Sequence, residues 1–594
     1  MEKKDSTDSI AVKNDAAMRE IPLGAFGFVD IRRYGDYYID KTKFLYEIVK
    51  RPRPFFLSRP RRFGKTLLLD TLECILSGQQ DLFKGLWIGQ SDYDWTPYPV
   101  IRLNMDEVEG SNLKEIKNSL IELMVDAAKA NNEKLDVTTP AKMLKRLIIG
   151  LNETHKKKVA VLIDEYDTPI IDNIKNPSMA EKIRVILRKF YRALKTNSKY
   201  LCHVFITGVT RFTQLSIFSG LNFLNDITLD EEYAAICGFT AEELEVLLSD
   251  RMERTLKGLI EKKSLPPLSD ENDLRQLIRD WYDGYSWDGQ TRVYNPWSVL
   301  SLFQKTKRSN YWLNTGTPDF LRQLAPRFSR NIDWLKNIPP ITEDELSIDN
   351  IEHLNPAVLM FQAGYLTIKE NLGPIKRSAG YSLRVPNLEV QASITPQLFE
   401  IDAADDPLEA KNWAKKTRDR LFKLDAPGVE EAFSFYLSQY SATAYTIFES
   451  KYQNLLEAAL YMADQKFDPQ AVTPHGILDF HIDGPNGERF IVELKVYREY
   501  VKKSPQAKRT IPTPKSINAP EEDSKIDHIP PPSSEKEIAK LKESMTPLAN
   551  EALSQIRKQY ADKFRADGKP LIMVALVMAR RTFVLAKFDV IEPE

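Results

Sequence analysis

Short apolar runs alternate with helical patterns from Ile21 to roughly Asp230. The clearest strand-like runs are PFFLS (54–58), YPVIRLNM (98–105), KKVAVLIDEYD (157–167) and LCHVFITG (201–208). Between them, apolar residues recur at helical spacing, as at Leu113, Ile116, Leu120 and Met124. Strands that alternate with helices are typical of α/β proteins, so the pattern predicts a parallel sheet covered by helices.

The pattern changes twice farther along the chain. Residues 240 to about 400 have mostly helical periodicity, and FQAGYLTIKE (361–370) predicts a strand that would suit the wing of a small helical domain. From about residue 427 the pattern is helix, hairpin, then helix and strands. The stretch 503–540 is rich in Pro, Ser, Lys and Glu, which predicts a disordered insertion in this last region.

Composition narrows the class of protein. The formal net charge of the chain is −1, so any nucleic-acid function must depend on a local basic surface. The three cysteines lie far apart and form no CxxC pair, which favours a reducing interior. No signal peptide is visible, and the apolar run Pro570–Ala579 is too short to span a bilayer. We expect an intracellular, cytoplasmic protein (nuclear if eukaryotic) without a membrane partner.

A candidate phosphate-binding loop follows the first strand. SRPRRFGKTLLLD (58–70) leads from the strand into a helical run, which is the context that a P-loop requires. Loop amides and the positive end of the helix would hold phosphates, with Lys65 reaching the β- and γ-phosphates and Thr66 binding Mg²⁺. Gly64 is present, but Arg59 stands where the first glycine of GxxxxGK[ST] is usual.

Two later strands complete this candidate ATP site. Asp164 would hold Mg²⁺ through water, and Glu165 would polarise the attacking water. Thr207 ends the next strand, where it would contact the γ-phosphate, and Arg211 follows it. Ligands of open α/β sheets bind at the carboxyl ends of the strands, where all these residues lie. The residues expected to bind nucleotide are Arg62, Gly64, Lys65, Thr66, Asp164, Thr207 and Arg211.

Each half of this site also has a simpler interpretation. GKT after a strand can be an incidental turn, and an acid pair at a strand end can be a surface feature. Thr207 and Arg211 are as compatible with structural roles. The two halves occur in order and on matching elements, which favours nucleotide binding and hydrolysis.

A second constellation lies in GILDFHIDGPNGERFIVELKV (476–496). Alternation along strands places Asp479 on one face of its strand, and Glu493 and Lys495 together on one face of the next. A hairpin centred on Asn486 would pair Asp479 with Glu493, at a separation where two carboxylates need a cation. Mg²⁺ would polarise a phosphate and activate a water, and Lys495 would orient that water.

The preceding helix offers a further acid. We expect Glu449 rather than Glu457 to serve, because Glu457 is predicted to face solvent. An acid followed by ExK also occurs by chance in exposed hairpins. The acidic helix before it and the helix and strand after it favour a nuclease site. The expected metal ligands of the two sites are Thr66, Asp164, Asp479, Glu493 and Glu449.

Many segments together resemble a family of bacterial and fungal proteins that join an AAA-ATPase-like domain to a C-terminal PD-(D/E)XK nuclease domain. The matching stretches include YYIDKTKFL (37–45), LSRPRRFGKTLLLD (57–70), VAVLIDEYD (159–167), FITGVTRF (205–212), IFSGLNFLNDITL (217–229), DGYSWDG (283–289), VYNPWS (293–298), FQAGYLTI (361–368), FESKYQNLL (448–456) and IVELKV (491–496). The family itself tends to have SRPRRFGK, so Arg59 fits it. The resemblance implies an ATP site at Lys65, Thr66, Asp164 and Glu165, and a nuclease triad of Asp479, Glu493 and Lys495 supported by Gln555.

The resemblance and the patterns together give four expected parts. These are a disordered N-terminus (1–18), an AAA-ATPase-like P-loop domain (19–235), a helical, winged-helix-like region (236–424) and a PD-(D/E)XK nuclease-like domain (425–594). We expect an ATP- and Mg²⁺-dependent protein that cleaves nucleic acid, with DNA as the expected substrate.

Three alternatives stay open. One is an ATP-driven switch whose nuclease-like domain only binds nucleic acid or a protein, and another is an interaction protein with both sites decayed. A homo-oligomer would supply an arginine from a neighbouring copy in place of Arg211. The aromatic stretch 281–298 could stack on bases, although core packing is favoured.

Overall fold

The computed structural model describes residues 19–23, 27–212, 224–261, 270–312, 338–348, 355–375, 378–391, 393–394, 407–438, 452, 455–457, 459–460, 463, 465, 467–469, 472–473, 476–477, 480–497, 532, 534–564, 570–579 and 583–592. The chain divides into two compact units. The first comprises Met1–Ser264, Leu268–Gly316 and Pro340–Asn387, and the second comprises Leu265–Pro267, Thr317–Pro339 and Leu388–Glu594.

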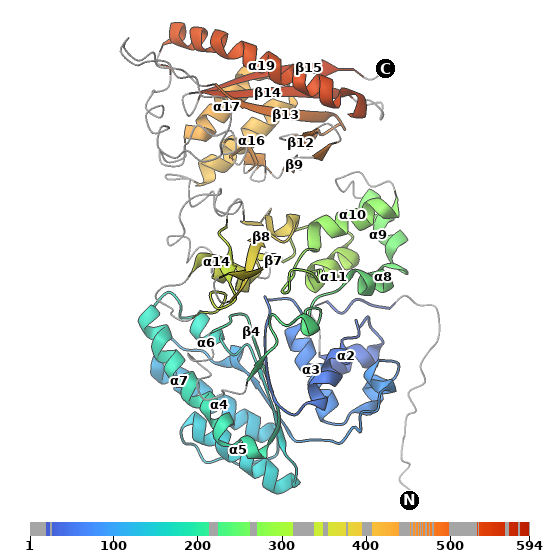
Figure 1. Cartoon of the computed structure of the whole chain (residues 1–594), viewed down its shortest axis with the longest axis vertical. Helices are drawn as coiled ribbons and strands as arrows, with labels where there is room; N and C mark the ends of the chain where they lie inside the picture. The colour runs from blue at the N-terminus through green and yellow to red at the C-terminus, as the bar shows by residue number, and fades with distance from the viewer. Residues whose placement is uncertain are drawn as a thin grey trace, which may run out of the picture. The chain divides into compact units, whose positions relative to one another are not determined.

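A five-stranded parallel sheet organises the first unit (Figure 1). Its strands are β1 (Pro54–Ser58), β2 (Val100–Asn104), β3 (Val159–Asp164), β4 (Leu201–Gly208) and β5 (Asn225–Asp226). They lie in the order β2-β3-β4-β1-β5, and every neighbouring pair is parallel. Every residue of β1 and β3 is buried, as expected for strands covered on both faces. The predicted α/β class is therefore confirmed.

Helices cover both faces of this sheet because each strand is followed by a crossover. Helices α4, α5 and α7 lie on one side of the strands, with α2 and α3 on the other (Figure 1). The helices of this layer structure are α1 (Phe28–Tyr34), α2 (Thr42–Lys50), α3 (Lys65–Leu76), α4 (Leu113–Ala130), α5 (Pro140–His155), α6 (Thr168–Ile171) and α7 (Pro177–Thr196). The predicted helix that starts at Leu113 is α4.

The rest of the first unit is helical with a small antiparallel sheet. It contains α8 (Ala241–Leu248), α9 (Met252–Glu261), α10 (Glu271–Tyr282), α11 (Pro296–Lys305), α14 (Pro356–Ala363), β6 (Ile341–Thr342), β7 (Thr367–Ile375) and β8 (Ser378–Arg384). The strands pair in the order β6-β8-β7. The strand expected over 361–370 begins only at Thr367, because residues 361–363 close α14. Tyr282, Tyr285, Trp287 and Tyr294 are buried, so the aromatic stretch packs in the core.

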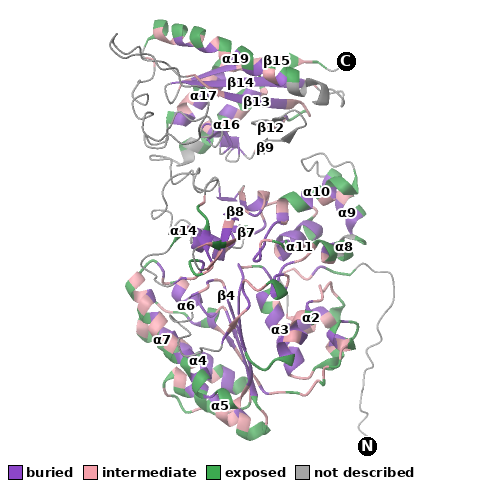
Figure 2. Ribbon diagram, in the orientation of Figure 1, coloured by how far each residue is buried: buried purple, intermediate pink, exposed green. Residues whose placement is uncertain are grey.

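The second unit is built on a mixed sheet in the order β15-β14-β13-β12-β9. Its elements are α16 (Pro407–Phe422), α17 (Ala426–Ser438), β9 (Phe467–Pro469), β10 (Val472–Thr473), β11 (Gly476–Ile477), β12 (Phe480–Asp483), β13 (Arg489–Val496), α19 (Glu535–Phe564), β14 (Leu571–Ala579) and β15 (Phe583–Ile591). Strands β12 and β13 form an antiparallel hairpin, and α19 then leads to β14, which runs parallel to β13. Both faces of the sheet are buried in separate apolar clusters (Figure 2).

Two features of the second unit differ from the sequence predictions. Residues 535–540 were expected within the disordered insertion but form the first turns of α19, whose buried face continues through Leu541 and Met545. Helix α16 precedes the expected boundary at residue 424, yet its Ala414 and Leu421 pack in the same cluster as β12 and β13. Residues 1–18 lie outside the described residues. Among the described helices, none has the length and apolar character that crossing a membrane requires.

Candidate functional site

The loop between β1 and α3 turns the chain so that helix α3 begins directly after Gly64. Arg62 and Gly64 both have positive φ, of 70° and 86° respectively, and glycine adopts this conformation without strain. Lys65 and Thr66 are the first two residues of α3, with the Lys65 side chain buried and Thr66 exposed. The first turn of a helix has backbone N–H groups without helical partners, which makes this loop suitable for binding phosphate.

Arg59, which replaces the usual first glycine, serves the structure of the loop. Its side chain is fully buried, and Nη1 donates hydrogen bonds to the carbonyls of Ser58 (2.9 Å) and Thr228 (2.8 Å). The guanidinium carbon also lies 4.1 Å from the centre of the Trp287 ring. Burial lowers the pKa of Arg59 to about 10. These contacts hold Arg59, the first residue of the loop, between the segment that follows β5 and the helical region.

Phe63 anchors the other end of the loop. Its buried ring makes edge-to-face contacts with Tyr285 and Trp287, at centroid distances of 4.8 and 5.3 Å. Both partners belong to the segment DGYSWDG (283–289). The helical region therefore holds the phosphate loop in place through aromatic packing.

We predict that Phe63→Ala destabilises the first unit by about 3–5 kcal/mol, because it leaves a cavity between two aromatic rings. Urea denaturation followed by tryptophan fluorescence would measure this, since Trp287 is a direct neighbour of the lost ring. Tyr34→Ala is the matched control, because Tyr34 is 76% exposed, and it should leave the transition unchanged. Equal effects of the two substitutions would show that Phe63 does not anchor the loop.

The carboxylate of Asp164 is held by two neighbouring strands. Thr207 on β4 donates its hydroxyl to Oδ1 over 2.5 Å, and Arg102 on β2 lies 3.2 Å from Oδ2. Arg102 also lies 3.3 Å from Asp70 on α3. Thr207, expected to contact a γ-phosphate, is fully buried and bonded to Asp164 instead. The structure thus presents Asp164 in a fixed orientation at the end of β3.

Lys65 and Glu165 form an ion pair inside the site. The lysine Nζ lies 3.3 Å from Glu165 Oε1 and donates to the carbonyl of Pro60 at the same distance. Glu165 has a φ of 48°, which is unusual for a residue other than glycine and turns the chain sharply after β3. The phosphate loop and the acidic strand end therefore meet, as the sequence predicts.

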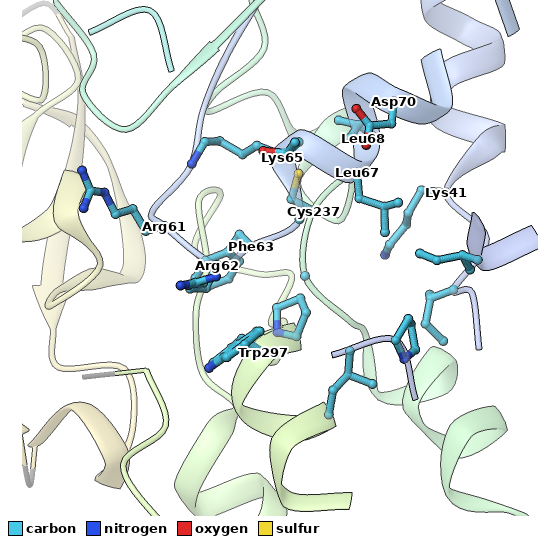
Figure 3. Close-up of a pocket in the computed structure, with 18 of the residues that line it drawn as sticks. Lys41, Arg61, Arg62, Phe63, Lys65, Leu67, Leu68, Asp70, Cys237 and Trp297 are labelled. Atoms are coloured by element: carbon cyan, nitrogen blue, oxygen red, sulfur yellow. The ribbon is translucent and has the colours of Figure 1, made fainter. Parts of the chain in front are cut away.

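These residues line one cavity of about 840 Å³ (Figure 3). Five predicted nucleotide-binding residues and the predicted catalytic acid are among its lining: Arg62, Gly64, Lys65, Thr66, Asp164 and Glu165. Arg62 lies over the Trp297 ring, 4.5 Å from its centre. The wall continues through apolar residues such as Leu23, Ile39 and Phe239. A cavity lined by both charged and apolar residues suits a ligand with phosphates and a planar base.

Arg211 takes part in a different set of contacts. Its Nε donates to Asp226 over 2.7 Å, and Nη2 lies 3.7 Å from Glu343. Neither Arg211 nor Thr207 is among the residues that line the cavity. In this structure Arg211, which follows β4, contacts β5 and the residue directly after β6.

Sequence reasoning missed several polar residues around the site. Lys41 is buried at the cavity wall and paired with Glu243 over 2.6 Å, and burial lowers its pKa. Asp167 is buried beneath the end of β4 and accepts hydrogen bonds from Val209 and Thr210; burial raises its pKa to about 6. Asp167 is the last residue of IDEYD (163–167), so the sequence shows an acid at the end of the motif but not its hydrogen bonds to the residues after β4.

The candidate nuclease residues lie on β13, in the middle of the second unit's sheet. Lys495 Nζ lies 2.9 Å from Glu493 Oε1, and Glu493 is 4% exposed. Val492 and Leu494 pack in the opposite cluster, as predicted from alternation. Phe480 pairs with Val492, which confirms the hairpin register centred on residue 486. Asp479 and Glu449 lie outside the described residues.

One expectation about the preceding helix is wrong. Glu457 was predicted to face solvent, but it is 6% exposed and accepts a hydrogen bond from Gln391 over 2.5 Å. The buried contact with a residue 66 positions away could not be seen in the local pattern. Within the described residues, no cluster of three or more His, Cys, Asp and Glu side chains is placed to hold a metal.

Comparison with known proteins identifies one domain and one full-length relative. Residues 22–218 match the family model described as "Predicted AAA-ATPase". An uncharacterized protein in the vnfD 5' region of Azotobacter chroococcum mcd 1 is 30% identical over 577 residues, covering 95% of this chain and 97% of that protein.

Solved structures give only weak similarity. The Aeropyrum pernix ORC2 protein is 12% identical, with a TM-score of 0.26 over 61% of this chain and 92% of the other. A Drosophila ORC chain, from a complex with poly(dA/dT) DNA and Cdc6, is 10% identical with a TM-score of 0.22. That match covers 74% of this chain and 61% of the other. Scores of this size carry no conclusion about function.

Proposed function

Because the chain belongs to the same family as the Azotobacter chroococcum protein and contains a domain of the predicted AAA-ATPase family, we propose that it binds and hydrolyses ATP with Mg²⁺. The observation that carries the proposal is the meeting of Lys65, Asp164 and Glu165 at one cavity. A lysine, a buried carboxylate and a second acid beside free helix amides are the groups that phosphoryl transfer needs.

The described residues fit both nucleotide and metal. Arg102 Nη1 is buried and has no hydrogen-bond partner among the described residues, so a phosphate oxygen would satisfy it. The Thr66 hydroxyl and the Asp164 carboxylate are oxygen ligands of the kind that Mg²⁺ prefers. When bound, Mg²⁺ would neutralise charge on the β- and γ-phosphate oxygens.

The chain's own residues then have separate tasks. The Lys65 ammonium would exchange Glu165 for the phosphates, which releases the carboxylate of Glu165. Glu165 would accept the proton of a water whose oxygen attacks the γ-phosphorus, while the bond to the β-phosphate oxygen breaks and ADP leaves. Thr207 and Arg102 would act as positioning residues, because they orient the carboxylate of Asp164.

Nucleotide binding tests this proposal directly. At a concentration a hundred times its dissociation constant, ATP should stabilise the wild-type protein by about 2.7 kcal/mol, which a thermal-shift assay detects. Lys65→Ala should abolish the shift, because it removes the cation from the phosphate site. Lys114→Ala is the matched control, since Lys114 is exposed in the first turn of α4. An undiminished shift in Lys65→Ala would overturn the assignment.

We propose in addition that the second unit cleaves phosphodiester bonds with Mg²⁺, and that DNA is its substrate. The pairing of Glu493 with Lys495 on a central strand favours this activity over a purely structural sheet. Glu493 would bind the metal together with Asp479, and Lys495 would orient the attacking water. A domain that only binds nucleic acid is the alternative, and cleavage assays distinguish the two.

A further inference from the structure

Helix α7 presents a basic surface that the ATP site does not use. Between Pro177 and Thr196 it carries six Lys and Arg residues and one acid, Glu181. The basic residues are Lys182, Arg184, Arg188, Lys189, Arg192 and Lys195, all exposed or half-buried. Its apolar side, including Leu187, Phe190 and Tyr191, is buried. The helix therefore packs its apolar side against the rest of the unit, and its cations lie on the side that is exposed (Figure 2).

The spacing of these cations makes a straight row. Arg184, Arg188 and Arg192 follow one another at four-residue steps, each about 6 Å along the helix axis. Lys195 continues the row one turn later, Lys189 lies beside Arg192, and Lys182 lies at the opposite edge of the exposed side. Arg184 pairs with Glu181 over 2.7 Å. In the described part of the chain the other five make no ion pair.

The neighbouring helix extends the same surface. Helix α5 packs beside α7 and adds the exposed side chains of Lys142, Lys145 and Arg146, of which Arg146 pairs with Asp136 over 3.1 Å. Helix α4, in the same layer, instead has three Lys and three Asp or Glu residues and is balanced. Because the whole chain has a net charge of −1, the excess of positive charge on α7 and α5 is local.

We infer that the exposed face of α7, extended by α5, binds the phosphate backbone of double-stranded DNA. Rows of cations on a rigid helix match the regular phosphates of a duplex. A single strand would need exposed aromatic side chains for stacking, but both aromatic residues of α7 are buried. A membrane surface would need an apolar face to insert, and that face of α7 packs inside the protein.

This inference rests on the proposed nucleic-acid function for the choice of ligand. It adds that DNA contacts the ATPase-like domain itself, on the helix that follows Asp164 and Glu165 and leads into β4. Binding would depend on charge rather than base sequence, because these arginines and lysines would contact phosphates and not base edges.

The test measures binding of the full chain to a fluorescent 30-base-pair DNA duplex at several salt concentrations, by anisotropy. The variant Arg188→Glu/Lys189→Glu/Arg192→Glu should weaken binding at least tenfold. It should also reduce the slope of log K against log salt by about 2.7, for three lost phosphate contacts. Its ATP turnover should equal that of the wild type. Arg188→Gln/Lys189→Gln/Arg192→Gln, which adds no repulsion, should show a smaller loss in the same direction.

Lys114→Glu/Lys117→Glu/Lys129→Glu on α4 is the matched control, since all three lysines are exposed. An equal loss in this control would overturn the inference. Unchanged binding by the α7 variants would also overturn the inference. The proposed nuclease function would still stand in that case, because the wild type binds DNA at another surface. Preference for an RNA duplex or a single strand over duplex DNA would overturn the choice of ligand. Failure of the wild type to bind any nucleic acid would overturn both this inference and the proposed nuclease activity.

Discussion

Replacing Glu165 by glutamine is expected to lower ATP turnover by about 10²–10⁴-fold while leaving ATP binding intact. The substitution keeps the size of the side chain but removes the carboxylate that would accept a proton from the attacking water. It also removes the negative partner of Lys65, which lies 3.3 Å away in the structure. Lys65 is then free to bind phosphate, so the affinity for ATP should be equal to or greater than that of the wild type.

Steady-state release of phosphate and equilibrium binding of ATP measure the two quantities separately. Glu122→Gln is the matched control, because Glu122 is exposed on α4 and should have no effect. Loss of ATP binding in Glu165→Gln would mean that the residue holds the nucleotide rather than activating water. Unchanged turnover would remove Glu165 from the catalytic site.

The second large effect concerns the C-terminal unit. Glu493→Gln and Lys495→Ala should each reduce Mg²⁺-dependent DNA cleavage by at least about a hundredfold, since each removes a group to which we assign metal binding or orientation of the attacking water. ATP turnover should be unaffected, because the cavity that contains Lys65 and Glu165 is lined entirely by residues of the first unit. Nicking of circular DNA with and without Mg²⁺ measures the cleavage.

Lys587→Ala is a suitable control for the nuclease variants, because it removes a lysine of β15, a strand separated from β13 by β14, and this lysine contacts Asn550 rather than Glu493. If the wild type binds DNA but never cuts it, the nuclease proposal is wrong. DNA binding that survives in the α7 variants would then assign the binding to the C-terminal unit, as the switch alternative holds. Cleavage that survives in both Glu493→Gln and Lys495→Ala would place the activity elsewhere or in a contaminant.

The parallel sheet could be predicted because its strands are short, buried apolar runs between helices. The predicted segments 54–58 and 201–208 coincide with β1 and β4, and 157–167 contains β3. The hairpin register also followed from the sequence, because the turn fixes which residues are opposite and Phe480 pairs with Val492. Local sequence patterns are therefore sufficient to predict both the parallel sheet and the strand that carries Glu493.

Contacts between distant parts of the chain could not be predicted. Arg59 bonds to Thr228, and Phe63 packs on Tyr285 and Trp287, so the loop is held by residues far away in sequence. Arg102 has no motif of its own, and its contact with Asp164 exists only because β2 and β3 are neighbours. Lys41 and Glu243, about two hundred residues apart, likewise pair only because the fold brings their two segments together.

Sequence patterns do not locate a helix boundary where composition and periodicity disagree. The residues 535–540 are rich in Lys and Glu like the preceding segment, yet they belong to α19 because Ile538 and Leu541 begin its helical repeat. Glu457 was misjudged because a local pattern cannot show that Gln391 supplies a buried hydrogen bond.

A crystal structure of the protein with a non-hydrolysable ATP analogue and Mg²⁺ tests the central claim most directly. We predict the triphosphate against the backbone amides of Gly64, Lys65 and Thr66, with the Lys65 ammonium moved from Glu165 to the phosphates. The base should lie against apolar residues of the cavity wall such as Leu23 and Phe239. A nucleotide bound elsewhere, or a cavity that stays empty with Lys65 still paired to Glu165, would contradict the account.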